Sequence, residues 1–265
     1  EATEKTQNAI DEYHRIIENK DDIAIYHKLA DLYCLMDERI SAINMLERGL
    51  KAFPESDDLA EYLCALYIKE GEYDKALEYA KSDYSKTKCY LMKGDNESAL
   101  RLLEKINDET NANYLALYAE YYFNKKDWQN CKEYIDKFAQ LSPQNPLVYQ
   151  MRALVADENN DLFGYHYNMG RCYSYKEEYE LALAEYLNAH RIDPKRSEAI
   201  KEIIKINEAT GDKTSLMEFY EKLHRQEPEN SVALKGLGDI YADMYEFSNA
   251  LEYYKKLENL NTSDY

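Results

Sequence analysis

The sequence of 265 residues contains only 8 glycines and 5 prolines, and it lacks the runs of valine, isoleucine and threonine that are typical of strands. Alanine, leucine, glutamate, lysine and tyrosine dominate instead. This composition favours helices and argues against a fold built on a sheet. No apolar stretch reaches the roughly 18 residues that are needed to cross a bilayer, so we expect no transmembrane helix.

Motifs that carry chemistry are missing as well. The sequence has neither a P-loop nor a GxSxG motif, and its five histidines are scattered. His190 and His224 lie 34 residues apart, which indicates packing on neighbouring helices, and no cysteines or clustered carboxylates nearby would complete a metal site. We therefore expect no catalytic residues, no cofactor, no metal and no enzymatic activity.

The cysteines are few, odd in number and without CxxC spacing. Each falls within a predicted helix, where cysteine packs as a small hydrophobic residue. Such use suits a reducing compartment, and we expect an intracellular, cytoplasmic protein. No signal peptide is visible, but the first residue is Glu1 rather than methionine, so a removed signal stays an open alternative. The five are Cys34, Cys64, Cys89, Cys131 and Cys172.

Positive charge is in short supply. Lysine and arginine total 33 against 51 aspartates and glutamates, which gives a formal net charge of -18. An acidic surface repels nucleic acid and anionic membranes, so we expect neither as a partner. The simplest interpretation of the surplus is a solubilising charge on exposed helix faces.

The sequence repeats with a period of 34 residues, most clearly in its C-terminal half. Pro194 and Pro228 are one period apart. A helical period of this length indicates a solenoid, here of roughly fifteen to seventeen antiparallel helices, and solenoids usually bind other proteins. Four further pairs lie two periods apart: Gly170 and Gly238, Tyr173 and Tyr241, Ala182 and Ala250, Tyr186 and Tyr254.

The order of residues within the period is aromatic, Leu, small, Tyr, turn, aromatic, Ala, aromatic, Ala, Pro, and it resembles the tetratricopeptide repeat. The clearest copies are 23–56, 163–196 and 231–264. The resemblance implies an all-α fold, a right-handed α-solenoid (superhelix) of antiparallel helix pairs. The copy at 197–230 departs from the pattern at Ile204, Asn207 and Leu216, where a small residue, Tyr and Ala are expected.

We divide the chain into units of one solenoid, 1–265. Two places break the rhythm. Ala76 and Ala99 are 23 residues apart, which predicts shortened helices at 73–82 and 84–93, and the segment 146–162 adds half a repeat. That segment is either an inserted helix (146–158) or a sign of residues missing near 159–163. The units are a half repeat at 7–20, then 23–56, 57–83, 84–111, 112–145, 146–162, 163–196, 197–230 and 231–264.

The two ends carry a further expectation. The chain starts on the second helix of a pair and stops at the last residues of a repeat, whereas solenoid ends need a polar cap. We expect that the protein continues beyond one or both ends, or that it associates with itself through them.

The first helix of each pair lines the concave groove in tetratricopeptide arrays. Helical phase then predicts a groove that is acidic in the N-terminal half and mixed-basic in the C-terminal half. The alternative is that the cations merely neutralise nearby acids such as Glu198, Glu208 and Asp239. The predicted partner-binding residues are Tyr167, Arg171, Lys201, Lys205 and Lys235. Their N-terminal counterparts are His27, Asp31, Asp58, Glu61 and Glu120.

These patterns predict a scaffold for protein–protein interaction. It would hold an extended peptide or a helix of a partner in the groove, with an acidic or phosphorylated segment preferred, as a subunit of a multiprotein complex. The alternative is a regulatory or targeting module of a larger enzyme. The Lys/Asn/Asn/Lys/Arg clamp with which some family members bind chaperone tails is absent, since the matching positions hold Tyr167, Arg171 and Gly236, or His27, Asp31 and Tyr62.

Overall fold

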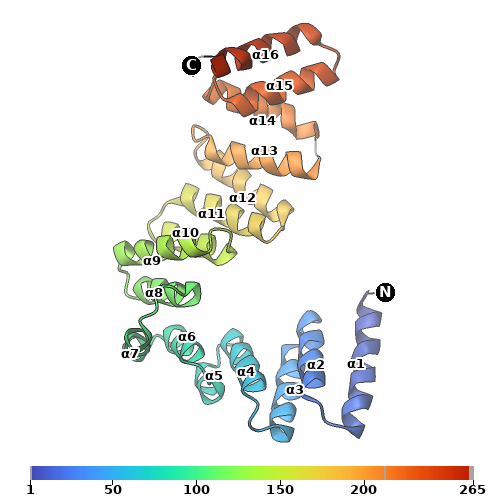
Figure 1. The fold of residues 1–265 in the computed structure, drawn as a ribbon, viewed down its shortest axis with the longest axis vertical. Helices are drawn as coiled ribbons and strands as arrows, with labels where there is room; N and C mark the ends of the chain where they lie inside the picture. Colours follow the sequence, from blue (N-terminus) through green and yellow to red (C-terminus); the bar gives the residue numbers. More distant parts are fainter. Residues whose placement is uncertain (1, 212, 263–265) are drawn as a thin grey trace. The chain divides into compact units, whose positions relative to one another are not determined.

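The computed structural model describes residues 2–211 and 213–262, and over these residues it consists of sixteen α-helices without a strand (Figure 1). From α1 to α8 and from α10 to α16, consecutive helices pack side by side and run antiparallel, which confirms the all-α class and the helix pairs predicted from the sequence. Among the described residues, none of these helices is long and apolar enough to cross a membrane. The helices are α1 (Ala2–Asn19), α2 (Ile23–Leu35), α3 (Arg39–Ala52), α4 (Asp57–Lys69), α5 (Tyr73–Tyr79), α6 (Asp83–Lys93), α7 (Asn96–Ile106), α8 (Ala112–Asn124), α9 (Trp128–Leu141), α10 (Pro146–Glu158), α11 (Leu162–Tyr175), α12 (Tyr179–Ile192), α13 (Glu198–Thr210), α14 (Lys213–Gln226), α15 (Ser231–Asp243) and α16 (Phe247–Thr262).

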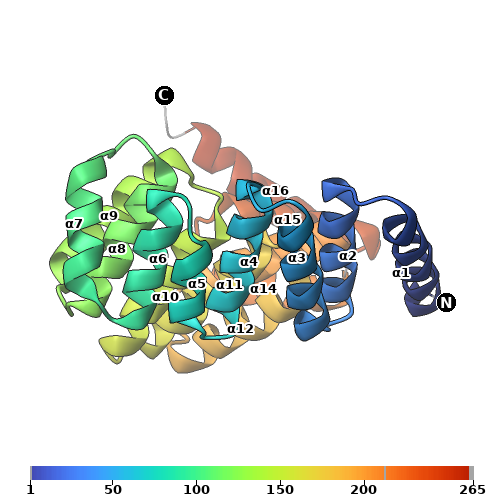
Figure 2. The same cartoon turned by 90° about the horizontal axis from the view of Figure 1, so that it is seen from below.

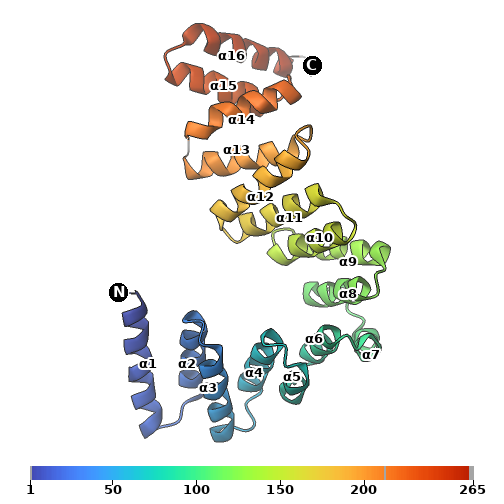
Figure 3. The same ribbon diagram turned by 180° about the vertical axis from the view of Figure 1, so that it is seen from behind.

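The helices form two compact units, residues 1–134 and 135–265. In the first unit, α3, α4, α5 and α6 each pack against the next (Figure 2). In the second unit, α13 to α16 follow one another in the same way (Figure 3). Within the segment 146–162, residues 146–158 form a helix, α10, whose amino end is capped by the side chain of Asn145. α11 lies between α10 and α12 and packs against both.

One turn design recurs between the helices of a pair. A residue with positive φ is followed by an acidic residue, whose backbone N–H donates to the carbonyl five residues earlier, as in a Schellman motif. The carbonyl belongs to a tyrosine in most cases, for example Tyr33 for Glu38 at 2.8 Å and Tyr241 for Glu246 at 2.8 Å. The turn therefore uses two of the commonest residue types of the sequence. The residues with positive φ at these turns include Asp37, Gly71, Gly94, Lys126, Asn160, Glu177 and Tyr245.

A steric constraint sets the distance between paired helices. A Cβ atom added to Gly170 of α11 would lie 2.6 Å from the ring of Tyr186 on α12, and one added to Gly238 of α15 would lie 2.5 Å from the ring of Tyr254 on α16. Tyr186 is fully buried. The ring of the second helix thus occupies the space that a larger residue on the first helix would need, which explains the small residue of the period.

Most of the cysteines are buried within this packing. Cys64, Cys89, Cys131 and Cys172 are inaccessible to solvent, Cys34 is half-buried, and all five are free thiols. Cys64 on α4 and Cys89 on α6 face each other, with their Sγ atoms 3.7 Å apart. They fill the small space between these two helices, as the interpretation of cysteine as a small hydrophobic residue implies.

The contact between Gly170 and Tyr186 can be tested by double substitution. We expect Gly170→Ala to lower the free energy of unfolding by about 1–3 kcal/mol, because overpacking outweighs the better helix propensity of alanine, about 1 kcal/mol. In a Tyr186→Leu background the cost of the same substitution should shrink, because the ring is gone. Urea unfolding followed by circular dichroism measures both, and an equal cost in the two backgrounds would show that the ring does not set the distance.

Candidate functional site

The candidate site is a pocket of about 270 Å³ in the second unit, which we call the Tyr167 pocket. Its side chains come from α11, α13, α14 and α15. Three of the five predicted partner-binding residues, Tyr167, Lys201 and Lys205, line it. Arg171 and Lys235 lie outside this lining.

α13 supplies most of the polar lining because its residues divide by helical phase. Ala199, Ile200 and Ile203 are fully buried in the core, whereas residues at spacings of three and four on the opposite face stay accessible. The polar residues of that face in the pocket are Glu198, Lys201, Glu202, Lys205 and Glu208. The exposed face of one amphipathic helix thus forms one wall.

Three apolar side chains, together with Tyr167 and Asn230, make the remaining lining. Ile204 and Leu223 are buried, and Val232 on the first turn of α15 is half exposed. Ile204 is one of the three residues at which the repeat pattern breaks. Because a small residue is replaced by isoleucine there, the repeat gains an apolar group at the pocket. The break at Ile204 is visible in the sequence, but no sequence pattern connects it with a site.

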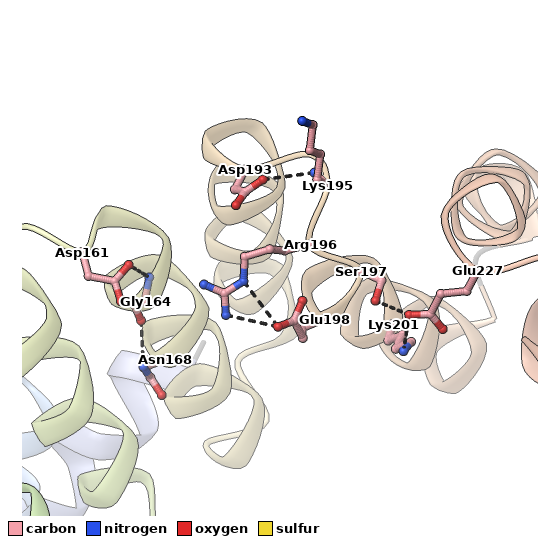
Figure 4. Close-up of polar contacts among 10 residues, drawn as sticks. All are labelled: Asp161, Gly164, Asn168, Asp193, Lys195, Arg196, Ser197, Glu198, Lys201 and Glu227. Atoms are coloured by element: carbon pink, nitrogen blue, oxygen red, sulfur yellow. Dashed lines mark hydrogen bonds and ion pairs between the residues drawn. The ribbon is translucent and has the colours of Figure 1, made fainter.

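Lys201 is held by an acidic partner (Figure 4). Its Nζ lies 2.6 Å from Oε1 of Glu227, and the same oxygen accepts a hydrogen bond from Ser197. The other carboxylate oxygen, Oε2, accepts from Asn230 at 2.7 Å. Burial alone would raise the pKa of Glu227, but these hydrogen bonds outweigh it and lower the pKa. The lysine therefore has its charge compensated within the protein.

The other groups around the pocket are paired in a similar way. Lys205 Nζ lies 2.8 Å from Oε1 of Glu202, and the Arg196 guanidinium lies 3.1 Å from Oε1 of Glu198 (Figure 4). The pKa of Glu198 is lowered, first by its own backbone N–H and then by Arg196. Two lysines against three glutamates leave the lining with one net negative charge. The pocket is thus a mixed surface and not a cationic patch.

The remaining two predicted residues differ from each other. Lys235 makes an exposed pair with Asp239, four residues later, at 3.6 Å. Arg171 stacks on aromatic rings instead: its guanidinium carbon lies 4.3 Å from the ring centre of Tyr149 on α10, and its Nη2 lies 3.3 Å from the hydroxyl of Tyr175. No sequence pattern points to Tyr149, because the half repeat at 146–162 has no counterpart elsewhere in the chain.

In the first unit, several predicted groove residues serve the fold. Tyr62 stacks on His27 and donates a hydrogen bond to Asp31 at 2.6 Å. Glu61 accepts from the backbone N–H of Lys81 at 3.0 Å and from Ser82, at the start of α6. Burial would raise the pKa of Glu61, but the hydrogen bonds from Ser82 and its neighbours lower it. These acids are occupied by intramolecular contacts.

The other two acids of the predicted N-terminal groove differ in their exposure to solvent. Asp58 is exposed at the start of α4. Glu120 on α8 is half-buried, and burial raises its pKa. Over residues 2–211 and 213–262, no group of three or more His, Cys, Asp or Glu side chains is arranged to hold a metal ion.

The fold defines a class, an all-helical repeat protein built of antiparallel helix pairs. No model of a known protein family matches the sequence, and a comparison with curated proteins found no match. Among solved structures, the human IFIT1 dimer with PPP-AAAA is similar, with 16% identity and a TM-score of 0.47 over 97% of this chain and 69% of that chain. MamA is similar with 15% identity and a TM-score of 0.34, over 89% and 98% of the two chains. Similarities of this size transfer no function.

The Glu227 cluster makes stability depend on pH. Because the folded-state pKa of Glu227 is lowered, its contribution is present above the unfolded-state pKa, about 4.3, and is lost as the pH falls through the folded value. We expect Glu227→Gln to lower the free energy of unfolding by about 0.5–1 kcal/mol at pH 7, and by less at pH 3. Urea titrations at the two pH values measure this. Glu229→Gln, an exposed carboxylate of the same loop, is the control, and an unchanged difference at pH 3 would contradict the assignment.

Proposed function

We propose that the protein is a non-enzymatic scaffold, a subunit of a multiprotein complex, and that the Tyr167 pocket receives one apolar side chain from an extended segment of a partner protein. The observation that supports this proposal most directly is the composition of the pocket. Tyr167 and Val232 offer accessible apolar surface, Ile204 and Leu223 are buried in the lining, and paired charges surround them. An apolar centre with a polar rim is the usual anatomy of a protein interface.

The size of the pocket supports the same proposal. Small-molecule sites usually enclose about 300–1,000 Å³, and the Tyr167 pocket, at about 270 Å³, falls just below that range. It suits a side chain better than a cofactor. Tyr167 at its edge adds apolar area with a polar tip, which is favoured at interfaces.

The ion pairs change what the partner should carry. An acidic or phosphorylated segment would meet Lys201 and Lys205 only in competition with Glu227 and Glu202. Exposed pairs of this kind contribute about 0.2–1 kcal/mol each. We therefore propose that the lysines adjust specificity and salt dependence, and that burial of the apolar side chain supplies most of the affinity.

A charge placed at the pocket edge tests the proposal. A library of random 12-residue peptides displayed on phage is selected against the whole protein, and the enriched peptides are synthesised. We expect them to share one large apolar residue, and Val232→Glu to weaken their binding about tenfold or more, because the new carboxylate must be desolvated when the apolar side chain enters.

Leu251→Glu is the matched control, since Leu251 on α16 is 53% exposed and Val232 is 50% exposed, and Leu251 does not line the pocket. Fluorescence anisotropy with labelled peptides measures both variants. If no peptide is enriched by the wild type, or if the two variants bind equally well, the pocket is not the binding site.

A further inference from the structure

Arg171 differs by its surroundings from the other three cations predicted to bind a partner. Lys201, Lys205 and Lys235 each have a carboxylate partner, and so do Arg152, with Asp136 at 2.6 Å, and Arg196, with Glu198. Within the described residues, the half-buried Arg171 side chain has no carboxylate within ion-pair distance. A guanidinium in this position keeps its charge but lacks a counter-ion from the protein.

The guanidinium is held in one place by aromatic rings. The rings of Tyr149 and Tyr175 stack with centres 5.0 Å apart and planes 19° apart, and the guanidinium carbon lies 4.3 Å and 5.8 Å from their centres. Tyr149 is itself fixed, because its hydroxyl donates to the carbonyl of Pro143 at 2.6 Å. Arginine has five N–H donors, and one of them is used on the Tyr175 hydroxyl. The others are pre-organised for an acceptor that approaches from outside.

Tyr167 and Arg171 are four residues apart on α11, so their side chains lie on one face, about 5–6 Å apart at Cβ. The Arg171 platform is therefore the neighbour of the Tyr167 pocket along that helix. In an extended segment, residues two apart are separated by about 6.8 Å and point to the same side. A partner that places an apolar side chain in the pocket brings the residue two positions away close to Arg171.

We infer that Arg171, on its platform of Tyr149 and Tyr175, is the anchor for one carboxylate, an Asp or Glu side chain of the segment that occupies the Tyr167 pocket. This inference rests on the proposed function and adds a recognition rule to it: an acidic residue two positions from the apolar one. A single guanidinium matches a single carboxylate, because both are planar and can form two parallel hydrogen bonds. A phosphate group would need a second cation, and the nearby lysines are already paired.

The same peptide selection tests this rule. We expect wild-type selections to enrich Asp or Glu two positions from the apolar residue. Selection with Arg171→Gln should lose the preference for an acidic residue and keep the preference for an apolar one. Arg171→Lys should lose most of the acidic preference, because an ammonium group cannot form the planar, forked contact. Arg152→Gln is the matched control, since Arg152 also lies beside the Tyr149 ring, at 5.7 Å, but is paired with Asp136.

A double-mutant cycle with one enriched peptide measures how much the contact between Arg171 and the carboxylate contributes to binding. Replacing its acidic residue by the matching amide should weaken binding to the wild type about 10- to 100-fold, and binding to Arg171→Gln less than about threefold. Thermal unfolding checks that each variant is folded, and Arg171→Lys serves for the cycle if Arg171→Gln is not.

The outcomes separate the two proposals. If the wild type enriches no peptide, the proposed function fails. If it enriches apolar residues without an acidic neighbour, or if the acidic preference persists in both Arg171 variants, the inference about Arg171 fails while the pocket stands. If the peptide with phosphoserine at the acidic position binds more than tenfold tighter than the peptide with glutamate, the assignment to a carboxylate is wrong.

Discussion

The close approach of a small residue on one helix to a large ring on the next is the contact on which the rest of this structure depends. With Gly170 against Tyr186 and Gly238 against Tyr254, the two helices of a pair are held at one separation and one rotation. Rotation fixes which residues of each helix are turned outward. α13 lacks this glycine contact, since Ile204 stands at the small-residue position. Its charged face, and with it the wall of the Tyr167 pocket, is set by the burial of Ala199, Ile200 and Ile203 in the core.

The acidic side chains that give the chain its large negative charge serve different purposes. Some cap the next helix after the turn, as Asp95 does by accepting a hydrogen bond from the backbone N–H of Ser98. Others pair with a lysine, as Glu227 does with Lys201. Such contacts compensate part of the positive charge locally. The guanidinium of Arg171 is distinguished by its tyrosine platform more than by its charge.

The sequence predicted the helices well because its signals were steric and periodic. Gly170, Tyr186 and the prolines recur at fixed intervals, and Gly71 and Gly94 stand at turns with positive φ. Helical phase also selected Tyr167, Lys201 and Lys205 as predicted partner-binding residues, and all three line the Tyr167 pocket. It could not say that Lys201 would be held by Glu227, because that pair joins α13 to the loop after α14 and depends on three-dimensional packing. The role of Tyr149 could not be predicted either, because the half repeat that carries it has no counterpart elsewhere in the chain.

The recurring turn has a consequence for how this sequence can vary. Its closing hydrogen bond joins backbone atoms, and the residue with positive φ is Asp, Gly, Lys, Asn, Glu or Tyr at different turns. The turn thus restricts the number of residues far more than the identity of the residue with positive φ. A single inserted residue would break the bond and rotate the following helix by about 100° relative to its partner, which would turn its apolar face away from the core. Substitutions should therefore accumulate at these turns during evolution while their length stays constant.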